Sequence, residues 1–200
     1  MKKTDLRVVK TLREIDEALL QNIAVRPFRD VTLGMLCETA LINKTTFYRY
    51  YSDKYDCLNS YLDRLMAEFR NRLDTEFLRA LPADLDKGAY RTQFLHLAQF
   101  VYSHKREYLT VWQAQLDRQL FDEMTAAMGE SVLQAARAGR SYDPRQEAFL
   151  TLYARLFSVH AMSLFDWWFR NEGLVTVDDV LSLMTGNMRS GLFATFRRLL

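Results

Sequence analysis

Turn-forming residues are scarce in this sequence. The chain has 200 residues, of which only 7 are glycine and 3 are proline. Because these two residues most often mark turns, their scarcity argues against many short strands and favours long helices. A hydrophobic content of 49% with 26% charged residues is ordinary for a globular chain that buries a core. The sequence therefore predicts an all-α protein.

Long uncharged apolar runs are also missing. The most apolar stretch, LFSVHAMSLFDWWF, is interrupted by His160 and Asp166, so we expect no membrane association. The N-terminus lacks the apolar core of a signal peptide. The two cysteines, Cys37 and Cys57, fit a reducing cytoplasm. We interpret both as buried small hydrophobes, with a thiol sensor as the alternative.

Patterns for catalysis or metal binding do not occur. His96, His104 and His160 are scattered without metal-ligand spacing, so we expect no metal. We find no phosphate-cradling glycine loop, no nucleophile elbow and no paired carboxylates suited to acid–base catalysis. The sequence therefore predicts neither an enzyme nor a cofactor.

The excess of positive over negative charge is small and unevenly distributed along the chain. The net charge is +2, and residues 1–56 have 10 Lys and Arg against 8 Asp and Glu. The remaining 17 basic and 17 acidic residues cancel. All the excess positive charge therefore lies in the N-terminal part of the chain.

What this N-terminal part does contain is a pair of short helices joined by a tight turn. The first spans about Thr32 to Thr39, with apolar residues at helical spacing and Thr32 as its N-cap. The second follows Asn43, another capping residue, and runs to about Tyr51. Only Phe47 and one or two neighbouring aromatics are needed to pack it against the first helix.

The second helix leaves a polar, cationic face outward, with no acid between Asn43 and Ser52. Such a face suits the edge of a DNA major groove. Lys54 falls in the first turn of the next helix, for which Ser52 is the expected N-cap. We expect its ammonium and the first-turn amides to bind a phosphate. A solvated lysine, offset by Asp53 and Asp56, is the alternative. The outward residues are Lys44, Thr45, Thr46, Tyr48 and Arg49.

The stretch LGMLCETALINKTTFYRYYSDKYDCL, preceded by Thr32, resembles the helix-turn-helix of the TetR family of one-component transcription regulators. The shared features are a VT start, an apolar first helix, a T-F-Y core, the following aromatics and an S-x-K. One departure is Leu41-Ile42, where the family usually has Gly-Val. Because branched residues resist a positive φ, we expect a slightly reshaped turn.

The resemblance also implies roles for single residues. Lys44, Thr45 and Thr46 would face bases or nearby phosphates. Tyr48, Tyr50 and Lys54 would hold the DNA backbone. Together with Thr32 and Arg49, these residues form the predicted DNA-binding set.

The implied architecture has two domains. Residues 1–53 form a helix-turn-helix DNA-binding domain, and residues 54–200 form a helical effector-binding and dimerisation domain. Apolar periodicity predicts helices at 4–25, 53–81, 87–103, 105–116, 118–138, 145–170 and 177–198. The helix that starts at residue 53 connects the two domains.

Small residues recur every four positions in the last predicted helix, at Ser182, Gly186, Ser190 and Ala194. Such a stripe lets another helix approach closely, and packing within one subunit would explain it. The resemblance implies instead that the last two helices form a two-fold dimer interface. A homodimer would match a palindromic operator in double-stranded DNA.

Aromatic residues concentrate in the middle of the chain, where 15 of the 26 lie between Tyr90 and Phe169. A packed core would explain them, whereas the resemblance implies a cavity for a small apolar or aromatic effector. Such a cavity is mostly apolar with a few polar groups. The candidate lining residues are Phe94, Phe100, Trp112, Tyr153, Phe157, His160 and Trp168.

We therefore expect a cytoplasmic, homodimeric repressor that a small effector releases from its operator. Two alternatives stay open. One is an activator that acts through a protein partner with the same DNA-reading helices. The other is a helical interaction module that has lost DNA binding, which the missing turn glycine makes conceivable.

Overall fold

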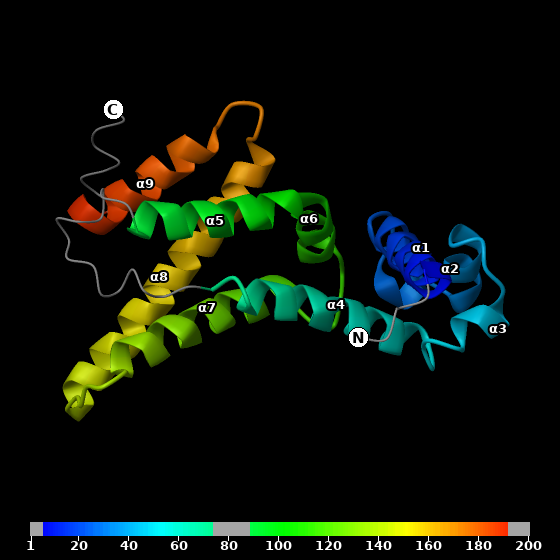
Figure 1. Cartoon of the computed structure of the whole chain (residues 1–200), viewed down its shortest axis with the longest axis horizontal. Helices are drawn as coiled ribbons and strands as arrows, with labels where there is room; N and C mark the ends of the chain where they lie inside the picture. Colours follow the sequence, from blue (N-terminus) through cyan, green and yellow to red (C-terminus); the bar gives the residue numbers. More distant parts are fainter. Residues whose placement is uncertain (1–5, 74–88, 192–200) are drawn as a thin grey trace. The chain divides into compact units, whose positions relative to one another are not determined.

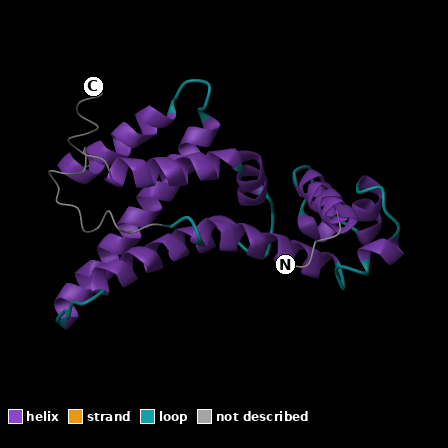
Figure 2. Ribbon diagram, in the orientation of Figure 1, coloured by secondary structure: helices purple, strands orange, loops and turns teal. Residues whose placement is uncertain are grey.

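The structure is a computed structural model that describes residues 6–73 and 89–191. These residues form helices, turns and loops and contain no strand, so the predicted all-α class is confirmed (Figure 2). The elements are α1 (Leu6–Ile23), the short 3₁₀ helix η1 (Phe28–Asp30), α2 (Leu33–Thr39), α3 (Lys44–Phe47), α4 (Lys54–Arg70), α5 (Ala89–Ser103), α6 (Lys105–Gln113), α7 (Leu120–Arg137), α8 (Pro144–Arg170) and α9 (Val177–Ser190).

Side-chain caps fix where α2 and α3 begin. The Thr32 hydroxyl accepts the Met35 amide at 3.2 Å, and the Asn43 side chain accepts the Thr46 amide at 2.8 Å. Both caps are the predicted residues. However, α3 ends at Phe47 rather than near Tyr51. Beyond Phe47 the amides of Arg49 and Tyr50 donate to carbonyls three residues earlier, so the regular α-helix ends there.

The start of α4 differs from the prediction by one residue. Asp53, and not Ser52, caps the helix, because its carboxylate accepts the amides of Tyr55 and Asp56, each at 2.8 Å. The Asp56 carboxylate in turn accepts the Ser52 amide at 2.8 Å. Two carboxylates thus face the positive end of the helix dipole. At its other end α4 stops at Arg70, and the predicted continuation over 74–81 lies outside the described residues.

Reciprocal caps open the two last helices. Asp143 and Gln146 form a capping box at the start of α8, and Thr176 and Asp179 form one at the start of α9. α9 ends at Ser190, and Gly191 follows with a φ of +80°. The predicted end of this helix, including Ala194, lies outside the described residues.

The chain divides into two compact units, whose bounds differ from those of the two predicted domains. The first contains residues 1–67 and 106–120, and the second contains residues 68–105 and 121–200. The first unit therefore includes most of α4 and α6, rather than ending at residue 53. Arg106 of α6 forms an ion pair with Glu17 of α1, and the Phe28 amide donates to the Gln115 carbonyl at 3.4 Å. These contacts hold the α6 segment to α1 and η1.

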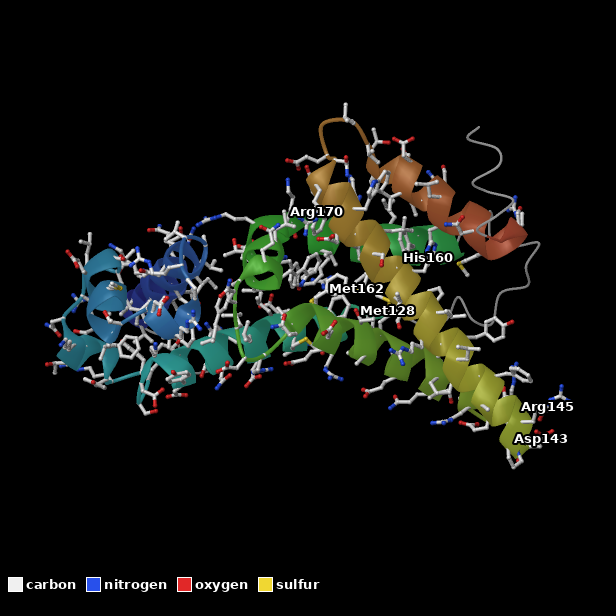
Figure 3. The ribbon with its side chains drawn as sticks, turned by 180° about the vertical axis from the view of Figure 1, so that it is seen from behind. Met128, Asp143, Arg145, His160, Met162 and Arg170 are labelled. Carbon is white, nitrogen blue, oxygen red and sulfur yellow. The ribbon has the colours of Figure 1, made fainter. Side chains whose placement is uncertain are left out.

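In the second unit α5, α8 and α9 pack against one another (Figure 1). α7 and α8 approach closely, because a Cβ atom added at Gly129 would lie 3.2 Å from the Ser158 hydroxyl. Met128 of α7 and Met162 of α8 are both buried in the core of this unit (Figure 3).

Candidate nucleic-acid interface

The outward face of α3 is built on one buried aromatic ring. Phe47 is fully buried and anchors the helix in the first unit, while Lys44, Thr45 and Arg49 are exposed. Tyr48 is 57% exposed and stands edge-on to Phe47, with ring centroids 6.1 Å apart. A short helix thus presents donors and cations to solvent at a fixed orientation, as groove binding requires.

The two cations of this face have no internal partner. Among the described residues, no hydrogen bond or ion pair involves the side chain of Lys44 or Arg49. The Thr46 hydroxyl, in contrast, donates to the Asn43 side chain at 3.0 Å. Because a phosphate only accepts hydrogen bonds, Thr46 would have to give up this bond to donate to one.

The turn before α3 contains no glycine, yet one of its residues adopts the positive φ that glycine usually has in such turns. Leu41 has a φ of +54° and is 92% exposed. The Ile42 amide donates to the Cys37 carbonyl at 3.0 Å, which is the closing bond of a Schellman motif with Leu41 at the position glycine usually occupies. The expected reshaping of the turn is therefore not observed, and Leu41 itself adopts the left-handed conformation.

Lys54 lies in the first turn of α4, as predicted, but its ammonium turns back toward η1. Its ammonium donates to the carbonyls of Phe28, Arg29 and Val31 at 3.0, 3.0 and 2.6 Å. The first-turn amides of Tyr55 and Asp56 are bound by Asp53. The predicted phosphate site at the start of α4 is thus corrected: both of its components already have partners within the protein.

Ion pairs join α1 to α4 within the first unit. The Arg64 guanidinium of α4 lies 2.5 Å from the Asp16 carboxylate of α1. Burial raises the pKa of the Asp16 carboxyl, and the charge of Arg64 opposes that rise. The pKa of Glu17 is lowered by its hydrogen bond from Arg106. These two ion pairs attach α4 and α6 to α1, and so stabilise the unit that contains α3.

The two thiols are buried, as predicted. Burial raises the pKa of Cys57 to about 12, and it also raises the pKa of Cys37. Since the thiolate is the reactive form, both side chains stay protonated and weakly reactive near neutral pH. This favours the hydrophobic role over the thiol sensor.

The seven residues predicted for an effector site are divided between the two units. Trp112 belongs to the first unit, where it stacks on Tyr108, while the other six belong to the second unit. Tyr153 is 66% exposed on α8. Phe94 is buried and stacks on Phe165 at 5.5 Å. Phe100 and Phe157 are half-buried.

Two of the predicted effector residues have polar partners in the core of the second unit. The Trp168 indole donates to the Val175 carbonyl at 3.2 Å. His160, in the middle of α8 (Figure 3), lies 3.1 Å from the Asn187 side chain of α9. Burial lowers the pKa of His160, so its ring is neutral near pH 7. The described residues contain no cluster of three or more His, Cys, Asp or Glu that could hold a metal ion.

One face of α8 is an exposed apolar row, which the sequence analysis did not separate from the core. Its members recur at helical spacing and are Phe149, Leu152, Tyr153, Leu156, Val159 and Trp167. By length and composition alone, α8 is the one described helix that could span a membrane, and 28% of its most apolar window is buried. The buried residues of α8, among them Ala154, Ala161 and Phe165, lie on its other side.

Comparisons with known proteins show the fold. No protein-family model matches the sequence, and no curated protein matches it. Among solved structures, the dihydroxyacetone kinase operon activator DhaS matches with a TM-score of 0.52 and 13% identity, over 94% of this chain and 97% of its own. The TetR-like regulator LfrR from Mycobacterium smegmatis, in complex with proflavine, gives a TM-score of 0.46 and 17% identity, over 93% and 98%. The likeness to DhaS extends over nearly the whole of both chains and shows that they share a fold.

Proposed function

We propose that this chain, which has a TetR-like fold, is a non-enzymatic transcription regulator that binds double-stranded DNA through α2 and α3. The observation that carries the proposal is the outward face of α3. Lys44 and Arg49 are exposed there without internal partners, and no acid lies between Asn43 and Ser52. Thr32, Thr45, Tyr48 and Tyr50 complete the proposed contact surface, with Thr46 held by Asn43.

The proposal includes a homodimer, and the exposed row on α8 supports it. Large apolar side chains in a continuous row are costly to leave in water, and a second copy would bury each row against its equivalent. A two-fold dimer would place two copies of α3 on two half-sites, which fits a palindromic operator.

Sedimentation of a charged variant tests this dimer. Leu156→Glu puts a carboxylate in the middle of the row and should yield monomers, because burying an unpaired charge in the interface is unfavourable. Gln134→Glu, at an exposed position of α7, is the matched control and should stay dimeric. A dimeric Leu156→Glu protein would place the interface elsewhere, and a wild-type chain that binds lipid vesicles would assign the row to a membrane.

We further propose that the second unit binds a small apolar or aromatic effector, with Phe94, Phe157, His160 and Trp168 as candidate contacts. The support is their position in an aromatic core with one neutral, half-buried imidazole. A thermal-shift screen of aromatic compounds tests it. A compound that raises the melting temperature of the wild type should lose its effect in Phe157→Ala.

The direction of regulation that we propose is repression, with release by the effector. DhaS is by name an operon activator, so activation through a protein partner is the second candidate. Reporter output separates the two, because deletion of a repressor raises expression from its target promoter and deletion of an activator lowers it. A gel shift with DNA upstream of the coding region, repeated at several salt concentrations, tests DNA binding itself.

A further inference from the structure

The lysine at the start of α4 is enclosed by backbone oxygens. A lysine ammonium has three hydrogens, and in Lys54 they point to the carbonyls of Phe28, Arg29 and Val31, 3.0, 3.0 and 2.6 Å away. The ammonium also lies 4.8 Å from the ring centroid of Phe28 and 5.2 Å from that of Tyr55. Three charge-assisted hydrogen bonds and two cation–π contacts therefore hold this half-buried cation against the backbone of residues 28–31.

The carbonyls that Lys54 binds belong to the segment leading into α2. Phe28 and Arg29 lie in η1, and Val31, which is fully buried, directly precedes Thr32. A cation at the carbonyl end of a helical turn is favourable. Lys54 thereby fixes η1 to the first turn of α4 and sets the position at which α2 begins.

Thr32 is the residue through which this arrangement can reach DNA. Its hydroxyl oxygen accepts the Met35 amide at 3.2 Å, and the side chain is exposed. The hydroxyl hydrogen can therefore be donated to a phosphate while the cap stays intact. A phosphate contact of this kind depends on where the backbone holds Thr32.

We propose that Lys54 is a positioning residue: it holds Thr32 and the start of α2 in place for DNA and does not itself touch a phosphate. This inference rests on the proposed DNA-binding function. Two lysines ten residues apart thus have different roles. Lys54 positions the backbone, whereas Lys44 stays open to solvent and can contact DNA.

Amine labelling of the wild-type protein tests this without any variant. Acetylation by a small reagent, read by mass spectrometry, should be slow at Lys54 and fast at Lys44 and at the exposed Lys10. Adding a duplex that the protein has selected from a randomised pool should protect Lys44 and leave Lys54 unchanged. Fast labelling of Lys54 in the free protein, or protection of Lys54 by the duplex, would overturn the inference.

A double-mutant cycle then tests whether Lys54 acts through Thr32. Lys54→Met keeps the length of the side chain and removes its donors, and it should weaken binding to the selected duplex about tenfold. The slope of log affinity against log salt should stay unchanged. In a Thr32→Val background, the same change should cost less than about twofold, because the contact that it positions is already gone. Lys54→Arg, which keeps donors and charge, should recover part of the loss.

The opposite pattern identifies a direct phosphate contact. In that case Lys54→Met would reduce the salt slope by about one and its loss would multiply with that of Thr32→Val. Failure of the proposed function is recognised separately, since no duplex would then be selected and Lys44 would not be protected. The slow labelling of Lys54 in the free protein would persist in that case, and the positioning role would fall with the function.

Discussion

The first turns of α3 and α4 each begin with a lysine, yet the two side chains have opposite surroundings. Lys44 follows the Asn43 cap and extends into solvent, and no hydrogen bond or ion pair among the described residues involves its ammonium. Lys54 follows the Asp53 cap and turns back into the protein, where three carbonyls bind it. Similar sequence positions thus leave one cation open to solvent and bind the other within the fold.

The two lysines show that a cationic side chain is free to bind a ligand only where the fold brings no backbone acceptors near it. The η1 turn brings the carbonyls of Phe28 and Arg29 close to the start of α4, where the Lys54 ammonium donates to them. Among the described residues, the Lys44 ammonium donates to no backbone oxygen. The side chains that remain without partners on the surface are the ones available for the proposed DNA contacts.

The largest expected effect is on stability, at Lys54. Lys54→Met removes three charge-assisted hydrogen bonds, although the Phe28 carbonyl keeps the Val31 amide as a donor, and it should lower the free energy of unfolding by about 1–3 kcal/mol. Lys44→Met should change it by less than about 0.5 kcal/mol, because an exposed side chain without partners is removed. Urea unfolding followed by circular dichroism measures both. Equal, small losses would erase the difference between the two lysines.

The next effect is on specific binding, at Lys44. Lys44→Ala should cost roughly 1–3 kcal/mol on a selected duplex and much less on random DNA, because base contacts specify and phosphate contacts position. Fluorescence anisotropy with both duplexes provides the affinities. An equal loss on the two duplexes would make Lys44 a phosphate contact and place the α3 helix differently.

A milder effect is expected at the other end of α3. Tyr48→Phe removes one neutral donor from a ring that is 57% exposed. Binding to selected and random duplexes should weaken alike by about 0.5–1 kcal/mol, with an unchanged salt slope, since no charge is lost. Loss on the selected duplex alone would show that Tyr48 reads a base.

The smallest effect concerns the turn between α2 and α3. Leu41→Gly relieves a left-handed strain of about 1–2 kcal/mol but increases the freedom of the unfolded chain by about 0.5–1 kcal/mol. A net stabilisation of up to about 1 kcal/mol should follow in thermal unfolding. Leu41→Ala, which keeps the Cβ atom, should show no such gain. A destabilised glycine variant would mean that the exposed Leu41 side chain has a stabilising contact.

Local signals in the sequence predicted the starts of helices well. Thr32 and Asn43 predicted the starts of α2 and α3. An N-cap can be predicted from sequence because it needs only a side-chain oxygen and the amides of the next three residues. The apolar run from Glu147 to Phe169 announced α8 for a similar reason, since periodicity is also local.

Long-range contacts were not predictable in the same way. Nothing near Lys54 in the sequence indicates that the carbonyls of Phe28 and Val31 will reach it. The attachment of α6 to α1 through Arg106 and Glu17 joins residues far apart in the chain. Periodicity also cannot tell a buried face from an exposed apolar one, so Tyr153 was predicted inside and lies on the outer row of α8.

Selection from a randomised duplex pool is the most direct test of the proposed DNA-binding surface. The wild-type chain should enrich a two-fold symmetric sequence. Lys44→Ala should enrich the same sequence with one position of each half-site relaxed, and Lys54→Met should enrich the unchanged sequence at lower affinity. A wild-type chain that enriches no sequence, or a Lys54→Met chain whose preferred bases change while those of Lys44→Ala do not, would contradict the account.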